Sequence, residues 1–255
     1  MLCILRGTPL ATGVAKKARE TGLVTHTHQL LRGLARRYPG VRLAVTQTGG
    51  VAGQPVDKLL TPEGLTVNLR CIATGFPEYL RGPGGGKSRQ LVRRYYEDEI
   101  DDPHNPVWRS LAEQYAQVIR DAGTADLLLQ NINPLVSVLK AGEFGLLASG
   151  PQGGLNITSV VHDGMDAERR FAFLARRAEC CGENLKLIAV SESVRQALIG
   201  CGVPGHAVRV VINGLDVSDF QERLRQARAG HVFERVRERN NLPAGCRAAC
   251  FFLMN

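Results

Sequence analysis

A histidine and an aspartate stand directly after an apolar run, at a place where ligand-binding residues of α/β sheets collect. His162 and Asp163 follow the run Asn156–Val161, and open α/β sheets bind ligands outside the carboxyl ends of their strands. A histidine there can donate a hydrogen bond to a sugar hydroxyl or a phosphate, while Asp163 can orient its ring or cap the next helix. A histidine that only stabilises a turn is the alternative interpretation.

A second candidate precedes the first long helix. The stretch Arg6–Thr21 follows an apolar run and leads into a helical pattern at Gly22. Backbone N–H groups at such a loop and helix start can hold phosphate. The stretch lacks the Gly-x-Gly-x-x-Gly fingerprint and is longer than a dinucleotide-binding turn, which disfavours NAD and FAD. A glycine-rich connector is the alternative.

Three consecutive glycines before Lys87 and Ser88 look like the end of a nucleotide-binding P-loop. The first glycine of that motif should stand at position 81, which is Arg81 here, and no strand leads directly into the run. ATP or GTP hydrolysis is therefore disfavoured. A flexible loop over a binding cleft, within Thr74–Lys87, fits this composition better.

Other polar residues give weaker signals. His26 and His28 stand two apart on a predicted helix, so at most one of them can face a cleft. Ser191 is a natural N-cap, and no Gly-x-Ser-x-Gly sequence surrounds it, which disfavours a serine hydrolase. The seven cysteines have no Cys-x-x-Cys pair and indicate reduced structural thiols. Zinc binding through Cys180 and Cys181 lacks the usual ligand spacing, so we predict no metal.

The strands and helices that must position these residues form the pattern of an α/β fold. Apolar, β-branched runs alternate with longer helical patterns, which is typical of parallel strands linked by crossover helices. We predict strands at Leu2–Leu5, Val41–Thr46, Leu65–Cys71, Ala125–Gln130, Asn156–Val161, Leu185–Val190 and Val208–Ile212. We predict helices at Gly22–Tyr38, Pro106–Ala122, Pro134–Leu147, Asp166–Cys181 and Ser191–Cys201, with a solvated helix face in Arg89–Asp102. Most of these strands are apolar throughout, which predicts a Rossmann-like, doubly wound parallel sheet covered on both faces.

Length and charge limit the classes of protein further. The 255 residues allow one large domain or two small ones, and 44% hydrophobic with 22% charged residues excludes a wholly disordered chain. A net charge of +8 favours polyanionic neighbours such as phosphorylated ligands, acidic lipid surfaces or nucleic acid. No run approaches the roughly 20 apolar residues of a membrane-spanning helix, and the N-terminus lacks the features of a signal peptide. We therefore expect a cytoplasmic protein.

The composition changes past Asp216. Residues 216–241 carry basic and acidic side chains at helical spacing, which indicates a solvated crossover helix rather than a nucleic-acid-binding arm. Leu242–Gly245 should break that helix, and Cys246–Met254 looks like the first strand of a further domain. We therefore divide the chain into a domain at 1–215, a crossover helix at 216–241, and the start of a missing second domain at 242–255.

The order of several motifs is more specific than any one of them. A strand ending in Ser191-Glu192 is followed by the helix Val194–Leu198, by Gly202-Val203-Pro204, by the strand Val208–Ile212 and by Asn213-Gly214-Leu215-Asp216 with Phe220. This order closely resembles the GT-B retaining glycosyltransferases of family 4, where it closes the N-terminal Rossmann-like domain. The helix that starts at Thr21-Gly22 resembles the family's glycine-led helix, with Thr21 in place of the first glycine. His162-Asp163 is similar to the family's histidine after a central strand.

The resemblance implies sugar transfer from a nucleotide-diphosphate sugar to an acceptor hydroxyl, with retained anomeric configuration and no metal or other cofactor. It implies that His162, with Asp163 secondary, is the catalytic candidate near the transferred sugar, and that Gly22 with Thr21 lies near the phosphates. Such an enzyme must stabilise a leaving diphosphate and an oxocarbenium-like centre. The family's donor-nucleotide pocket belongs to a second domain, so this chain alone is expected to be incomplete and inactive.

Three functional hypotheses remain open on the sequence. The chain is the acceptor-side half of a truncated glycosyltransferase, or a subunit that needs a separate donor-domain partner, or a non-catalytic nucleotide-binding protein with a Rossmann-like fold. Its basic charge is also compatible with peripheral contact with an anionic membrane. Turnover assays with nucleotide sugars distinguish these hypotheses.

Overall fold

The computed structural model describes residues 2–5, 22–48, 57–60, 66–72, 88–147, 154–162, 168–214, 217–229 and 232–239. The chain divides into two compact units, Met1–Ile212 and Asn213–Asn255. In the second unit, the charge-rich stretch predicted as one crossover helix contains two helices, α7 (Val217–Ala229) and α8 (Val232–Arg239). The predicted strand at Cys246–Met254 lies outside the described residues.

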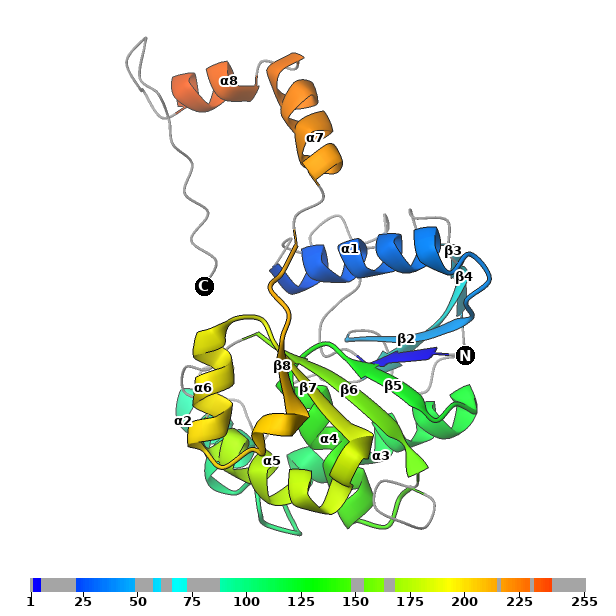
Figure 1. Ribbon diagram of the computed structural model, residues 1–255, viewed down its shortest axis with the longest axis vertical. Helices are drawn as coiled ribbons and strands as arrows, with labels where there is room; N and C mark the ends of the chain where they lie inside the picture. The colour runs from blue at the N-terminus through cyan, green and yellow to red at the C-terminus, as the bar shows by residue number, and fades with distance from the viewer. Residues whose placement is uncertain are drawn as a thin grey trace. The chain divides into compact units, whose positions relative to one another are not determined.

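The first unit is built on one eight-stranded sheet with the order β3-β4-β2-β1-β5-β6-β7-β8 (Figure 1). The strands are β1 (Leu2–Leu5), β2 (Leu43–Thr48), β3 (Asp57–Leu60), β4 (Thr66–Ile72), β5 (Asp126–Leu129), β6 (Asn156–Val161), β7 (Leu185–Ala189) and β8 (Val208–Val210). All ladders are parallel except the pairing of β3 with β4. The predicted Rossmann-like α/β class is therefore confirmed.

The antiparallel edge strand β3 is the element that the sequence did not predict. Asp57-Lys58-Leu59-Leu60 neither alternates nor forms a long apolar run, so its pattern does not indicate a strand. Its four residues pair only with β4, from Asp57 opposite Leu69 to Leu60 opposite Thr66. Pairing with an existing sheet edge, rather than local propensity, accounts for this strand.

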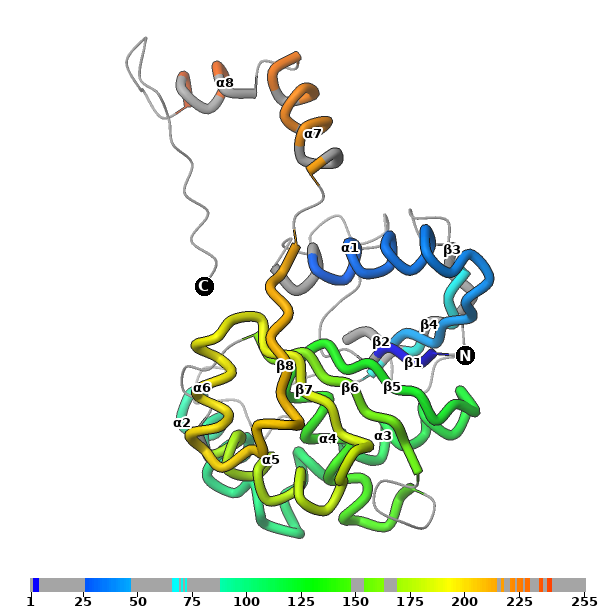
Figure 2. Tube along the Cα trace, viewed as in Figure 1, coloured from blue at the N-terminus to red at the C-terminus, as the bar shows by residue number. Residues whose placement is uncertain are grey.

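Helices cover the sheet from two sides. Helix α1 (Gly22–Arg37) lies on one face, whereas α3 (Pro106–Ala122), α4 (Ile132–Glu143) and α5 (Glu168–Cys181) lie on the other (Figure 1). Helix α6 (Glu192–Gly200) packs against β7, β8 and α5. The path of the chain from β5 to α4 can be followed by colour in Figure 2.

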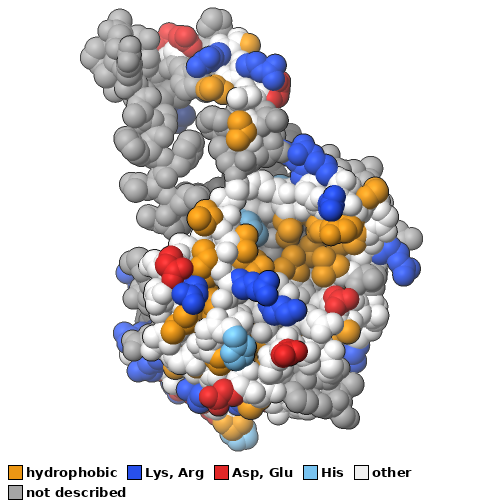
Figure 3. All heavy atoms as spheres, viewed as in Figure 1, with side chains coloured by type: hydrophobic (Ala, Val, Ile, Leu, Met, Phe, Trp, Pro, Cys, Tyr) orange, Lys and Arg blue, Asp and Glu red, His pale blue; other side chains and the backbone are white. Residues whose placement is uncertain are grey.

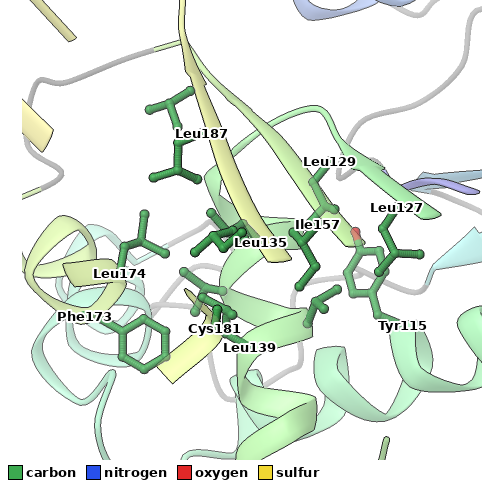
Figure 4. Packing of buried hydrophobic residues seen from close by; sticks show 14 of the residues in the cluster. Tyr115, Leu127, Leu129, Leu135, Leu139, Ile157, Phe173, Leu174, Cys181 and Leu187 are labelled. Atoms are coloured by element: carbon green, nitrogen blue, oxygen red, sulfur yellow. The ribbon is translucent and has the colours of Figure 1, made fainter. Parts of the chain in front are cut away.

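The main core lies between the sheet and α3, α4 and α5 (Figure 4). Leu127 and Leu129 of β5, Ile157 of β6 and Leu187 of β7 face the helices and are at most 2% exposed. These side chains alternate along their strands with less buried neighbours, as expected for residues that point to opposite faces of a sheet. A smaller core forms between α1 and strands β1, β2 and β4.

The stretch Arg89–Asp102 is helical, but only partly in the predicted way. It begins as α2 (Arg89–Arg93), capped by Ser88, and continues as the π-helix η2 (Arg94–Asp98). Tyr95 and Tyr96 of η2 pack against the main core, and the Tyr96 ring meets Trp108 edge-on with centroids 5.3 Å apart. One side of the stretch therefore serves the core rather than the solvent.

A lysine is buried in the core on the helix side of the sheet. Lys140 of α4 is 1% exposed, its Nζ lies 2.8 Å from a Glu143 carboxylate oxygen, and it approaches the Phe173 ring to 5.1 Å. Glu143 also pairs with Arg177 of α5. Burial, opposed by Asp101 and reinforced by Arg177, lowers the pKa of Lys140 to about 8.

The lowered pKa of Lys140 predicts a pH dependence of stability. Free lysine titrates near 10.5, so between about pH 8 and about pH 10.5 the unfolded chain binds this proton more readily than the folded one. The free energy of unfolding contributed by Lys140 should therefore rise as pH increases through this window. Urea unfolding of the wild-type chain and Lys140→Met at about pH 7.5 and about pH 10 tests this. A wild-type-minus-variant difference that stays constant with pH would contradict it.

Candidate functional site

The candidate site lies at the topological switch point of the sheet. From β1 the chain moves to β2 and β4 on one side, whereas from β5 it moves to β6, β7 and β8 on the other. Strands β1 and β5 are neighbours, so the order of the strands reverses between them. The crevice outside the carboxyl ends of such strands is where open α/β sheets bind ligands.

His162 stands at this edge, immediately after β6. Its side chain is partly buried, and its Nε2 atom is buried without a hydrogen-bond partner among the described residues. A hydrogen bond joins the ring to the backbone of Gln130. Burial, aided by nearby His26, lowers the pKa of His162 to about 4. The imidazole is therefore neutral at physiological pH.

Helix α1 brings a second histidine to the same place. The His26 and His162 rings meet edge-on, with centroids 4.9 Å apart and planes at 83°. His26 lies in the second turn of α1, the helix that begins at Gly22. The sequence predicts that at most one of His26 and His28 faces a cleft, and His26 is the one that contacts His162.

Gln130 and Thr27 connect α1 to the end of β5. The Thr27 hydroxyl donates to Gln130 Oε1 at 2.6 Å, and Gln130 Nε2 lies 3.5 Å from His26 Nδ1. Thr27 and Gln130 are 0% and 2% exposed, respectively. A buried polar network of this kind fixes side-chain orientations, because each broken bond would leave a group unsatisfied.

Sequence reasoning missed Gln130 and Thr27 as members of the site. Gln130 was predicted only as the last residue of an apolar strand. A polar residue at the carboxyl end of such a strand was the available signal. Of the other predicted site residues, Gly22 begins α1, while Thr21 and Asp163 lie outside the described residues. Ligand binding by any of these residues remains a prediction.

A second polar cluster follows β5 on the side of α4. Arg170 of α5 donates to Asn133 Oδ1 at 3.1 Å and lies 3.7 Å from a Glu97 carboxylate oxygen. Asn131 stands at the N-cap position of α4, but its side chain makes no capping bond, and its Oδ1 is buried with no partner in the described part of the chain. The charge of Arg170 is thus matched by Glu97, so this cluster mainly ties α5 to α4 and η2.

The structure settles the role of Ser191 at the end of β7. Its hydroxyl accepts a hydrogen bond from the Val194 N–H at 3.2 Å and caps α6. The predicted N-cap is therefore confirmed. The hydroxyl is occupied by the backbone, which fits a structural role rather than that of a nucleophile.

One face of the molecule carries charged side chains of both signs. On the face shown in Figure 3, Lys and Arg side chains lie among acidic ones and beside a group of apolar side chains. Within the described ranges, no three His, Cys, Asp or Glu side chains come together as a metal site would require. No helix in those ranges is both long enough and apolar enough to cross a membrane.

The neutral state of His162 predicts a sensitivity to acid. Free histidine titrates near 6.5, so between about pH 6.5 and about pH 4 the unfolded chain binds this proton more readily than the folded one. His162 should therefore lower the free energy of unfolding as pH falls through that window. Urea unfolding at about pH 7 and about pH 4.5 should show a smaller acid-induced loss in His162→Gln than in the wild type. Equal losses would mean that the fold does not hold His162 neutral.

Comparisons with known proteins found similarity at the level of solved structures only. No protein-family model and no curated protein matches the chain. Sucrose-phosphate synthase from Thermosynechococcus elongatus is 11% identical, with 89% of this chain and 96% of that chain covered and a TM-score of 0.48. An E. coli structure described as trehalose-6-phosphate bound with UDP-2-fluoro glucose is 14% identical, with 83% and 48% covered and a TM-score of 0.48.

UDP-N-acetylglucosamine 2-epimerase from Rickettsia bellii is 11% identical, with 95% of this chain and 52% of that chain covered and a TM-score of 0.45. This chain thus spans about half the length of the E. coli and Rickettsia proteins. Identities this low concern the fold alone. The strand order and register described above, rather than these similarities, define the fold of this chain.

Proposed function

We propose that this chain is the acceptor-side domain of a retaining glycosyltransferase, which transfers a sugar from a nucleotide-diphosphate sugar to an acceptor hydroxyl. The observation that carries the proposal is His162 Nε2, a buried hydrogen-bond acceptor without a partner among the described residues, at the switch-point edge of the sheet. Buried polar atoms in native proteins are almost always paired. A ligand hydroxyl at this position would supply the missing donor.

The order of motifs from Ser191 to Asp216 supports the same proposal, because it resembles the family described above. The sequence alone allowed His162 to donate to a ligand. With a ring held neutral and one nitrogen bonded to Gln130, we infer instead that His162 accepts a hydrogen bond from a sugar hydroxyl. This contact would orient the sugar for transfer.

Other residues take roles that the chemistry of the reaction requires. A leaving diphosphate needs backbone N–H groups or positive charge, and we propose that the start of α1, at Thr21 and Gly22, supplies the first of these. Asp163 would orient the imidazole ring of His162. In this proposal the reaction needs no metal, since fixed donors neutralise the leaving group. A donor domain, in the same polypeptide or in a partner chain, would hold the nucleotide.

Binding and turnover measurements test this function. Calorimetric titration of the complete enzyme, with its donor domain present, should show binding of UDP-, GDP- or ADP-linked hexoses that depends on the sugar and is weakened by His162→Ala. Pyrophosphate alone is titrated for comparison. Binding that pyrophosphate reproduces fully would favour a nucleotide-binding protein without sugar chemistry. Appreciable sugar transfer by this chain alone would contradict the requirement for a donor domain, whereas transfer only with a co-purifying donor chain would favour a split enzyme.

We further propose peripheral contact with anionic membranes for a cytoplasmic enzyme of this kind. The net charge of +8 supports it, since basic proteins are attracted to acidic lipid surfaces. Sedimentation with vesicles of acidic lipid should remove the chain from solution, and neutral vesicles should not. Equal behaviour with both vesicle types would contradict membrane contact.

A further inference from the structure

Gln130 contacts both histidines of the candidate site and Thr27, each through a different group. It stands directly after β5 at the switch point and is 2% exposed. Its backbone bonds to the ring of His162, its side-chain oxygen accepts from Thr27, and its side-chain nitrogen faces His26.

The backbone contact determines which nitrogen of His162 carries the proton. Nε2 has no partner among the described residues, so the hydrogen bond to Gln130 belongs to Nδ1. That bond raises the pKa of His162, as a ring N–H donating to a backbone carbonyl does. A neutral imidazole with its proton on Nδ1 presents Nε2 as an acceptor.

The side chain of Gln130 determines which nitrogen of His26 carries the proton, and the result is the opposite of that for His162. Because the Thr27 hydroxyl donates to Oε1, the amide nitrogen of Gln130 faces His26 Nδ1. An amide NH₂ group can only donate, so Nδ1 of a neutral His26 must accept, and its proton resides on Nε2. The separation of 3.5 Å is long for a hydrogen bond, as polar contacts in unliganded sites often are.

We propose that Gln130 is a positioning residue that holds the two histidines in opposite tautomers, with the proton on Nδ1 in His162 and on Nε2 in His26. A ligand atom that meets His162 must then donate a hydrogen bond. A hydroxyl satisfies this condition, and a phosphate oxygen does not. The statement about the ligand rests on the proposed function, whereas the tautomers are a property of the protein alone.

Three substitutions separate this role from a structural one. Gln130→Met keeps the backbone carbonyl but removes the amide, so His162 should keep its proton on Nδ1 while His26 becomes a mixture of tautomers. Thr27→Val removes the donor that orients the amide and should produce the same mixture. Gln130→Glu replaces the amide donor with an acceptor, which should move the His26 proton to Nδ1.

Long-range ¹H–¹⁵N NMR of the histidine rings in the full chain tests the proposal without any ligand. Resonances are assigned with His26→Ala and His162→Ala, and signal dispersion shows that each variant is folded. We expect a single tautomer for each ring in the wild type, opposite in the two, with the changes given above in the variants. The same tautomer in both rings, or a His26 tautomer unaffected in every folded variant, would overturn the proposal.

The same spectra separate this proposal from the proposed function. Opposite tautomers with no response to UDP-glucose would leave Gln130 as a positioning residue and count against sugar binding. Sugar binding at a His162 ring that carries its proton on Nε2 would support sugar binding and overturn the assignment of Gln130. Loss of stability in Gln130→Met without any change of tautomer would indicate a structural role and overturn the assignment.

Discussion

Replacing His162 with alanine is expected to lower sugar transfer by the complete enzyme roughly 10- to 100-fold, with little loss of stability. The expected loss of activity reflects a neutral hydrogen bond and the orientation of the sugar that depends on it. Stability should change much less than activity, because removing an Nε2 that is buried without a partner in the described part of the chain offsets the loss of the hydrogen bond to the Gln130 backbone. Steady-state kinetics and urea unfolding of the same preparations measure the two effects.

A histidine elsewhere in the chain provides the control. His206 lies on the short 3₁₀ turn before β8 and is exposed, so His206→Ala should leave both transfer and stability near the wild-type values. If His162→Ala instead lowered stability and transfer in proportion, His162 would be a structural residue of the turn after β6. The sequence left that interpretation open.

Replacing Asn105 with alanine is expected to lower the free energy of unfolding by about 3 kcal/mol. Asn105 is fully buried at the N-terminus of α3 and uses both ends of its amide. Its Oδ1 accepts from the N–H groups of Val107 and Trp108 at 3.0 and 3.2 Å. Its Nδ2 donates to the carbonyls of Tyr95 and Glu99 at 2.7 and 2.9 Å.

The substitution would leave all four backbone groups without this partner, and it would remove the hydrogen bonds from Asn105 to the carbonyls of Tyr95 and Glu99. Ser191→Ala is the matched control, because Ser191 also caps a helix but makes one such bond. Its expected cost is about 1 kcal/mol. Urea unfolding of both variants compares them directly. If Asn105→Ala cost no more than Ser191→Ala, the bonds from Nδ2 to η2 would contribute nothing to stability.

The sheet was largely predictable because buried parallel strands have a strong sequence pattern. Runs such as Leu2–Leu5 and Leu185–Ala189 are apolar over most of their length. The helix at Pro106–Ala122 has a proline at its first position and is followed by Gly123 in the left-handed conformation. Element ends were less predictable. Helix α4 begins at Ile132, two residues before the predicted start at Pro134. Proline is tolerated throughout the first turn of a helix, so its position does not define the first helical residue.

The π-helix η2 could not have been predicted from local sequence. The charges of Arg89–Asp102 indicate a solvated helix, and nothing in that stretch shows that Asn105 donates to the carbonyls of Tyr95 and Glu99. Those bonds depend on how α3 packs. The local pattern therefore predicted helical character but neither the change of helix type nor the burial of the tyrosines.

The candidate site was predictable one residue at a time, but not as a network. The position of His162 after an apolar strand was sufficient to single it out. Its contact with His26, and the bonds of Gln130 to α1 across more than a hundred residues, depend on tertiary structure. Thr21 and Asp163 lie outside the described residues, and their roles stay predictions.

The measurement that tests sugar recognition at His162 most directly is the ¹⁵N resonance of its Nε2 during titration with UDP-glucose, GDP-mannose and pyrophosphate. A hydroxyl that donates to this nitrogen should shift its resonance in a saturable way with at least one nucleotide sugar. Pyrophosphate carries no sugar hydroxyl that could donate to Nε2, so it should leave this resonance unchanged. A shift with pyrophosphate equal to that with the sugars, or no shift with any sugar that binds, would contradict sugar recognition at His162.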